Sequence, residues 1–363
     1  MAQSLWALWM LAMVTSWLVS RNTAMADRPT AMFIFGDSLV DVGMNNNVPS
    51  LARANYRPNG IDYPGGVPTG RFCNGRLISD FLSEYWRIPP ALAYDDPANM
   101  GETLLNGANF ASAGAGILND TGMVFNKRFP MDQQVDFFRE HKEKLIALVG
   151  TEEASRILAG ASVSITIGSN DFLSNYFIPI SPRRARYTLP EYINLLIPEL
   201  KRQVMSIYEI GARKIVVAGV GPLGCIPFII AMRFGTNQGR CVEKYQQIAM
   251  DFNARLVSLV QELQETLTDA TFLYSNAFDL SLQLIQNPAL YGFTTVNKAC
   301  CGRGPYGGLI ACNRFDPVCP DRTKYVFWDP FHPTEAVNRL VSQQLLFGPP
   351  SVISPMNLSQ LFA

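Results

Sequence analysis

The sequence lacks any excess of charge. Over its 363 residues, 30 basic and 30 acidic side chains cancel, only 17% of residues are charged, and no block of like charge occurs. Because binding to nucleic acid or to an anionic membrane needs clustered basic side chains, the sequence argues against both kinds of partner. Hydrophobic residues make up 48% of the chain, which is enough for a large core, so we expect a globular protein.

Histidine is also scarce, with only His141 and His332 in the whole chain. His141 lies in a charged run, 139–144, and we expect it on the solvated face of a helix. His332 follows Asp329 by three residues, in a turn between two prolines and just before a predicted helix. In such a turn the carboxylate can hold one imidazole nitrogen while the other faces outward, which is the geometry of a general base. Alternatively, Asp329 only caps the turn.

No Cys-x-x-Cys pair occurs, and no histidine lies between Cys300 and Cys319, so we expect no zinc site and no other metal. Six of the seven cysteines are predicted to form disulfides, with their connectivity left open. The six are Cys225, Cys241, Cys300, Cys301, Cys312 and Cys319, and Cys73 is left over.

The longest N-terminal apolar run, 5–19, is too short to span a bilayer comfortably, and Ala24-Met25-Ala26 after it matches a cleavage pattern. Residues 1–26 are therefore predicted to be a signal peptide, which leaves a secreted mature chain, 27–363, without stable membrane insertion. A membrane anchor is the alternative, because no lysine or arginine precedes the run. In a secreted protein, Asn119 and Asn357 would be glycosylation candidates, since each begins an Asn-x-Ser/Thr pattern.

Along the mature chain, short apolar segments alternate with segments of helical periodicity. Strands are predicted at 31–35, 104–111, 161–167, 214–220 and 271–274, and the main helices at 76–87, 132–148, 190–210, 245–267 and 334–346. The helices at 76–87 and 132–148 are expected to turn Tyr85 and Leu148 inward. This alternation predicts an α/β fold with a central parallel sheet and helices on both faces. No internal repeat or linker interrupts it, so we expect a single domain over 27–363.

Small or polar residues follow three of the predicted strands, and chemistry in open α/β sheets collects at such strand ends. Ser38 follows the first strand, where we expect the chain to turn into a helix whose N-terminus would favour a developing oxyanion. Gly114 lies in a loop of small residues after the second strand, and Asn170 follows the third. Acyl transfer requires a nucleophile, a base, an orienting acid and oxyanion donors. Ser38 can supply the nucleophile, His332 the base and Asp329 the acid. The donors can be the N–H groups of Ser38 and Gly114 and the side-chain amide of Asn170. Taken singly, Ser38 and Asn170 also fit turn or capping residues.

These segments resemble the sequence blocks of plant-type GDSL esterases/lipases, a group of the SGNH hydrolase superfamily. The blocks are 35–41 (FGDSLVD), 109–116 (NFASAGAG), 168–171 (GSND) and 329–333 (DPFHP), in family order, with further matches at 70–75 and 221–225. The resemblance implies a flavodoxin-like three-layer fold, with Ser38 as nucleophile, His332 as base and Asp329 as its partner. It also implies an oxyanion hole formed by Ser38, Gly114 and Asn170. Met44 and Ala113 depart from the usual pattern, but neither change removes a catalytic group.

The sequence therefore predicts a secreted serine hydrolase that cleaves carboxylic esters through an acyl-enzyme, without a cofactor. The absence of a Gly-x-Ser-x-Gly motif argues against an ordinary α/β-hydrolase lipase. The main alternative is an acyltransferase, in which an alcohol instead of water resolves the same acyl-enzyme, as in relatives that build cutin. The expected substrates are small-molecule, lipid or polyester esters in the apoplast or cell wall, and the sequence carries no signal of oligomeric state.

Overall fold

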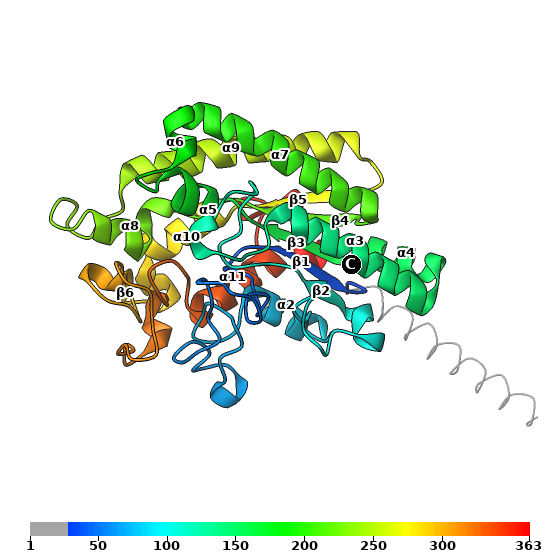
Figure 1. Cartoon of the computed structure of the whole chain (residues 1–363), viewed down its shortest axis with the longest axis horizontal. Helices are drawn as coiled ribbons and strands as arrows, with labels where there is room; N and C mark the ends of the chain where they lie inside the picture. Colours follow the sequence, from blue (N-terminus) through cyan, green and yellow to red (C-terminus); the bar gives the residue numbers. More distant parts are fainter. Residues whose placement is uncertain (1–27) are drawn as a thin grey trace, which may run out of the picture.

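The computed structural model describes residues 28–363 (Figure 1), so the predicted signal peptide lies outside the described residues. The centre of the fold is a six-stranded sheet with the order β2-β1-β3-β4-β5-β8. Its strands are β1 (Met32–Gly36), β2 (Gly107–Asn109), β3 (Ser162–Thr166), β4 (Lys214–Ala218), β5 (Thr271–Ser275) and β8 (Ile353–Ser354). All neighbours pair in parallel except β5 and β8. The strand order 2-1-3-4-5 is the flavodoxin-like order, which confirms the predicted fold class.

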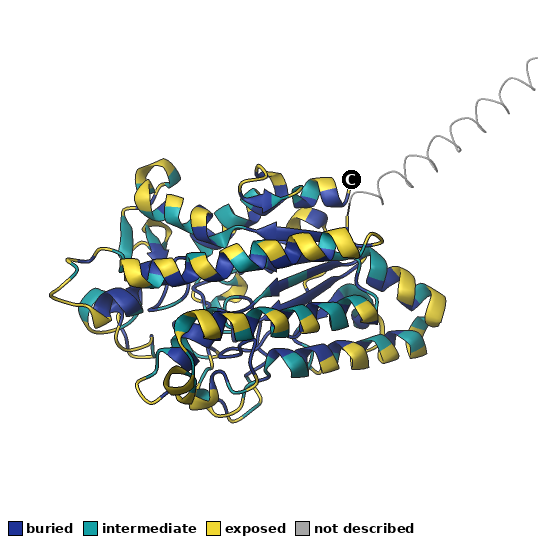
Figure 2. Cartoon of the chain, turned by 90° about the horizontal axis from the view of Figure 1, so that it is seen from above, coloured by how far each residue is buried: buried dark blue, intermediate teal, exposed yellow. Residues whose placement is uncertain are grey.

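Helices cover both faces of the sheet, and Figure 1 shows α7 and α9 above the strands and α2 and α11 below them. One face packs against α3 (Met131–Val149), α4 (Thr151–Gly160), α7 (Leu189–Ile210) and α9 (Glu243–Thr266). The other packs against α2 (Ile78–Trp86), α11 (Glu335–Phe347) and α12 (Leu358–Leu361). Figure 2 shows the buried positions in the strands and on the inner helix faces, as expected for amphipathic helices on a sheet.

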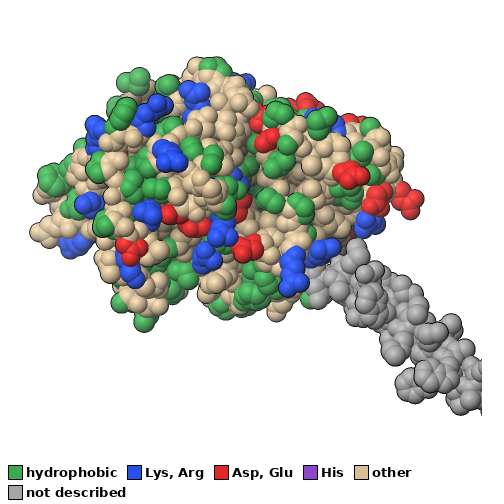
Figure 3. All heavy atoms as spheres, turned by 90° about the horizontal axis from the view of Figure 1, so that it is seen from below, with side chains coloured by type: hydrophobic (Ala, Val, Ile, Leu, Met, Phe, Trp, Pro, Cys, Tyr) green, Lys and Arg blue, Asp and Glu red, His purple; other side chains and the backbone are tan. Residues whose placement is uncertain are grey.

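Shorter elements complete the chain. They are α5 (Ser169–Asp171), the π-helical turn η4 (Phe172–Tyr176), α6 (Pro182–Arg186), α8 (Pro227–Met232), α10 (Ala277–Gln286) and the 3₁₀ turns η1 (Pro64–Gly66), η2 (Gly101–Asn106), η3 (Met123–Phe125), η5 (Leu223–Cys225), η6 (Pro288–Tyr291), η7 (Pro305–Gly307) and η8 (Arg322–Lys324). A small second sheet joins β6 (Thr295–Ala299) to β7 (Tyr325–Phe327). Acidic and basic side chains are both scattered over the face seen in Figure 3. Among the helices of residues 28–363, none combines the length and the apolar character that crossing a membrane requires.

Local sequence explains where the long helices begin and end. At the start of α7, the Thr188 N–H donates to Glu191 Oε2 at 2.8 Å, which closes a capping box just before Pro190. The helix ends at Gly211, whose positive φ a residue with a Cβ atom rarely adopts. On α9, buried apolar residues recur every three or four positions, so the whole helix lies against the sheet.

The prediction that His141 faces solvent is wrong, because its side chain is fully buried in α3. The ring lies edge-on to Phe33 and Phe110, and Nε2 lies 3.1 Å from the carbonyl oxygen of Leu104. Since a carbonyl only accepts, Nε2 carries the proton and the buried Nδ1 has no partner. Burial lowers the pKa of His141 to about 4. It is a neutral core residue.

Three further predictions need correction. Strand 104–111 is shorter than expected: η2 occupies its first part, and only Gly107–Asn109 pair as β2. Gly107 is needed there because a Cβ atom would lie 2.0 Å from the carbonyl oxygen of Met32 on β1. Tyr85 and Leu148 were expected to face inward but are 45% and 42% exposed. Both lie near the last turns of α2 and α3.

The cysteine-rich segment supports the loop that carries Asp329. The six predicted cysteines form the pairs Cys225–Cys241, Cys300–Cys319 and Cys301–Cys312, and Cys73 is a buried free thiol. The N–H of Cys301 donates to the carbonyl oxygen of Trp328 at 2.8 Å. The fully buried Trp328 packs against the cysteines of the last two pairs. The residue immediately before Asp329 is therefore held by a cross-linked segment.

Candidate active site

The structure brings Ser38, His332 and Asp329 together, although Ser38 and His332 are 294 positions apart. His332 Nε2 lies 2.7 Å from Ser38 Oγ, and His332 Nδ1 lies 2.7 Å and 2.8 Å from the two Asp329 carboxylate oxygens. An ionised carboxylate only accepts hydrogen bonds, so Nδ1 carries the proton and Nε2 is free to accept one from Ser38. The N–H groups of Phe331 and His332 also donate to Asp329 Oδ1 at 2.8 Å. The turn itself thus fixes the carboxylate.

Ser38 lies in a tight turn at the carboxyl end of β1. Gly36 ends the strand, and a Cβ atom there would lie 2.2 Å from the carbonyl oxygen of Thr166 on β3, so only glycine fits. The N–H groups of Val40 and Asp41 both donate to the Asp37 carbonyl and close the turn. The expected helix after Ser38 is wrong, because the next α-helix in the chain is α2, which begins at Ile78. Ser38 therefore does not lie at the N-terminus of a helix.

Gly114 and Asn170 line the same cavity as Ser38. Asn170 lies in α5, directly after β3, and its Nδ2 donates to the carbonyl oxygen of Ala115 at 3.0 Å, while Ser174 Oγ donates to its Oδ1. This orients the amide next to the Gly114 loop. Within residues 28–363, the backbone N–H groups of Ser38 and Gly114 have no hydrogen-bond partner in the protein, which leaves both available to a bound oxygen.

Two buried aspartates that the sequence analysis did not single out connect these loops. Asp41 accepts from the N–H of Gly43 at 2.7 Å and from that of Ala113 at 2.9 Å, and so ties the Ser38 turn to the loop of Gly114. Asp171, next to Asn170, accepts from the N–H groups of two loop residues and from Thr121 Oγ1. Burial raises the pKa of Asp41 to about 7 and that of Asp171 to about 6. Both aspartates lie inside sequence blocks that resemble the family, and this was the sequence feature that could have pointed to them.

Asp37, the residue before Ser38, is buried and faces the same cavity. Burial raises the pKa of Asp37 to about 7, against the effects of the Leu39 N–H bond and of the nearby His332. The long loop 43–75, between the Ser38 turn and α2, contributes Phe72, whose ring centroid lies 5.0 Å from that of His332. The imidazole is therefore covered on one side by an apolar ring.

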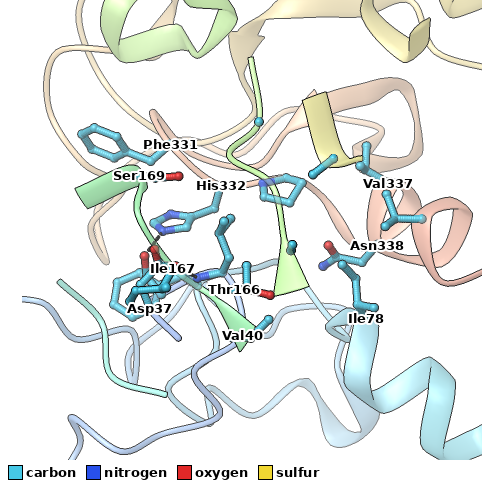
Figure 4. Close-up of a pocket in the computed structure, with 18 of the residues that line it drawn as sticks. Asp37, Val40, Ile78, Thr166, Ile167, Ser169, Phe331, His332, Val337 and Asn338 are labelled. Carbon is cyan, nitrogen blue, oxygen red and sulfur yellow. Dashed lines mark hydrogen bonds between the residues drawn. The ribbon is translucent and has the colours of Figure 1, made fainter. Parts of the chain in front are cut away.

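The cavity measures about 360 Å³ and is lined mainly by apolar side chains. It begins at Ser38 and His332 and continues between the sheet and helices α2 and α11. Figure 4 shows Ile78, Thr166, Val337 and Asn338 around the part of it beside His332. A volume of this size suits a small-molecule ligand.

Comparison of the sequence with known proteins matches the chain to one family. The sequence model of the GDSL-like lipase/acylhydrolase family matches residues 32–345. The chain belongs to the GDSL esterase/lipase family. It is 45% identical to GDSL esterase/lipase At4g28780 of Arabidopsis thaliana over 96% of this chain and 94% of that protein. It is 43% identical to GDSL esterase/lipase LTL1 of the same plant over 91% of this chain and 90% of that protein. The GDSL family assignment makes the protein a carboxylic ester hydrolase.

The remaining predicted sites lie away from this centre. Asn119 is exposed, and its Nδ2 donates to Asp132, whereas Asn357 is half-buried and caps α12. Glycosylation of either residue stays a prediction. In the part of the chain that the structure describes, no group of histidine, cysteine, aspartate and glutamate side chains is arranged to hold a metal ion.

Proposed function

We propose that this GDSL esterase/lipase hydrolyses carboxylic esters through a Ser38–His332–Asp329 triad and an acyl-enzyme intermediate. The observation that carries the proposal is the unbroken line of hydrogen bonds from Ser38 Oγ through the imidazole to Asp329. A serine hydroxyl is a weak nucleophile unless an adjacent base takes its proton. His332 is the base that lies within hydrogen-bond distance of it.

In the first half-reaction, His332 Nε2 takes the Ser38 proton as Oγ attacks the ester carbonyl carbon. The carbonyl oxygen becomes an oxyanion, which accepts hydrogen bonds from the Ser38 and Gly114 N–H groups and from Asn170 Nδ2. Collapse of this intermediate breaks the ester bond, and His332 returns the proton to the departing alcohol. Water, activated by His332, then attacks the acyl-enzyme and releases the acid and free Ser38.

Asp329 acts by orientation and charge. Its carboxylate keeps the proton on His332 Nδ1 and stabilises the imidazolium that forms when Nε2 takes the Ser38 proton. The backbone bonds from Phe331 and His332 to Asp329 Oδ1 hold the carboxylate in place for this role. The mechanism uses no cofactor.

We also propose that the chain is secreted and acts outside the cell, in the apoplast or cell wall, as one domain. The predicted cleavage after Ala26 and the three disulfides support this, because disulfides persist in oxidising compartments. Sequencing the N-terminus of the protein from a plant culture medium should give Asp27 as the first residue. Retention of residues 1–26 in a membrane fraction would instead indicate an anchor.

The test of the catalytic proposal is a fluorophosphonate probe, which phosphonylates an activated serine. Wild-type protein should be labelled and should hydrolyse p-nitrophenyl esters. The Ser38→Ala variant should be neither labelled nor active on these esters. Ser174→Ala, which removes a nearby serine that lines the cavity, should still be labelled. Labelling or ester hydrolysis that persists in Ser38→Ala would assign the chemistry to another residue.

A further inference from the structure

The two faces of strand β3 are packed very differently. Val163 and Ile165 are fully buried against the helices on one face. On the opposite face Ser164 and Thr166 are only half-buried, although β3 is a central strand and α2 and α11 cover that side. Protein interiors are normally packed as densely as crystals, so an incompletely filled layer at the centre of a sheet is unusual. The unfilled space is the inner part of the cavity that starts at Ser38.

Small side chains in register create this space. Thr166 on β3 lies opposite Ala218 on β4, and Ala218 in turn lies opposite Ser275 on β5. One rung further from the active site, Ser164 lies between Ile34 and Val216. Ser164, Thr166, Ala218 and Ser275 are too small to fill the gap to the helices, whereas Ile34 and Val216 belong to the core that packs against α2 and α11 and flank the space. The result is a channel that follows β3.

The channel has a definite direction and length. Its open end is at Thr166, opposite Gly36, two residues before Ser38. Its far end is lined by Met32 and Ser162, which pair with each other, and by Leu358 of α12, all nearly fully buried. From Thr166 to Ser162 the strand rises about 13 Å, at about 3.3 Å per residue. The channel therefore starts at the nucleophile and is blind.

The wall opposite the sheet is mainly apolar. Ile78 and Leu82 from α2 and Val337, Val341 and Leu345 from α11 line it, and Ser79 and Asn338 of the same helices are its polar members. Among the described residues that line the cavity, the acidic and basic side chains are Asp37, Asp329, His332 and Arg53, and Arg53 belongs to the loop at 43–75. A blind, mainly apolar channel of this length suits an extended aliphatic chain and disfavours a charged group.

We propose that this channel binds the acyl chain of the substrate, with the ester carbonyl at Ser38 and the methyl end near Met32. This assignment rests on the proposed function of Ser38, and it names the substrate class: esters of linear, medium-chain aliphatic acids. Burial of each methylene removes apolar surface from water and is worth roughly fourfold in affinity. The enzyme should therefore prefer a decanoate ester to an acetate ester.

The test fills the channel midway. Ser164→Leu adds bulk at the centre of the channel, and Ser164→Ala is its matched control, since it removes the same hydroxyl without adding volume. We expect the ratio of kcat/KM for p-nitrophenyl decanoate to that for the acetate to fall at least tenfold in Ser164→Leu, because several methylenes lose their site. Ser164→Ala should keep the wild-type ratio to within about threefold. A ratio that is the same in all three proteins would overturn the proposal.

A second position guards against misfolding of the first variant. Ala218→Leu adds bulk from the neighbouring strand, opposite Thr166 and nearer to Ser38. Ala218→Leu should also lower the ratio of kcat/KM for the decanoate ester to that for the acetate ester. Far-UV circular dichroism checks that each variant is folded. If neither folded variant changes the ratio, the chain binds elsewhere.

Binding separates this proposal from the catalytic one. In isothermal titration calorimetry, decanoate itself should bind the folded Ser38→Ala protein and should bind at least tenfold more weakly when Ser164→Leu is added. This result would support the channel even if Ser38 proved not to be the nucleophile. Equal binding with and without Ser164→Leu would reject the channel even if Ser38 proved to be catalytic.

Discussion

Asn170→Ala offers a sharp test of how the oxyanion is stabilised. Its side-chain amide has two N–H groups, and one of them donates to the Ala115 carbonyl at 3.0 Å, which fixes the amide beside Gly114. Loss of one preorganised oxyanion donor lowers kcat by about 10² to 10³, or about 2.7 to 4 kcal/mol of transition-state stabilisation. The lost bond to Ala115 is worth only about 1 kcal/mol in the free energy of unfolding. Turnover should therefore fall much more than stability.

Steady-state hydrolysis of a p-nitrophenyl ester measures the effect. Because the oxyanion exists only along the reaction path, we expect kcat to fall with little change in KM. The control is Ser174→Ala, which removes the hydroxyl that donates to Asn170 Oδ1 and leaves the amide donor intact. It should lower kcat less than tenfold. A folded Asn170→Ala enzyme with wild-type kcat would remove Asn170 from the mechanism, and equal losses in both variants would point to loop geometry instead of donation.

Two predictions concern stability. Burial lowers the pKa of His141 from 6.5 to about 4. As the pH falls, the unfolded chain therefore binds a proton at this histidine before the folded protein does. The free energy of unfolding should fall by up to about 3 kcal/mol between pH 6.5 and pH 4. Urea unfolding of His141→Gln should show a shallower decline over this range, and a decline as steep as that of the wild type would contradict the assignment. The Cys225–Cys241 bridge closes a loop of 16 residues, so replacing both cysteines by alanine should cost about 3 kcal/mol and lower Tm by about 4 °C. An unchanged Tm in calorimetry would mean that this cross-link does not constrain the unfolded chain.

β1, β4 and β5 could be predicted from sequence because they appear as nearly continuous apolar runs, and β3 because its buried Val163 and Ile165 alternate with Ser164 and Thr166. Each of these strands was predicted to within a few residues. The two-residue strand β8 is too short to leave a pattern, and it pairs with β5 in the antiparallel direction. The β6–β7 sheet belongs to the disulfide-linked segment, where cross-links and turns outweigh periodicity.

His141 shows how a local pattern can mislead. Its charged neighbours suggested solvent, but position 141 shares a helix face with the buried residues Phe138 and Leu145, three positions before and four after it. The helical spacing of position 141 indicates its burial better than the charge of its neighbours in the sequence does. The same limit applies to Asp41 and Asp171, because their roles come from backbone N–H groups in distant loops that no local pattern encodes.

The residues of the candidate site could be named from four short sequence blocks, but these blocks do not show how far apart the side chains lie in the folded protein. The line of hydrogen bonds from Ser38 to Asp329 depends on a turn at one end of β1 and on a distant loop near the C-terminal end of the chain, which the cysteine-rich segment holds in place. The channel left no sequence signal that was recognised, because small serine, threonine and alanine residues on a strand do not by themselves show which space they leave unfilled. Their meaning depends on which face of the sheet they occupy.

Strand β3 connects these features through its alternation. Its odd-numbered residues, Val163 and Ile165, fill the core, while its even-numbered residues, Ser164 and Thr166, leave the channel open. The strand then ends, and Gly168, with a positive φ, turns the chain so that Asn170 reaches the Gly114 loop. A shift of one residue in the pairing of β3 would put the large side chains into the channel and the hydroxyls into the core. The packing that stabilises the sheet therefore also fixes the channel in register with Ser38, so the proposed acyl site and the proposed catalytic site depend on the same strand alignment.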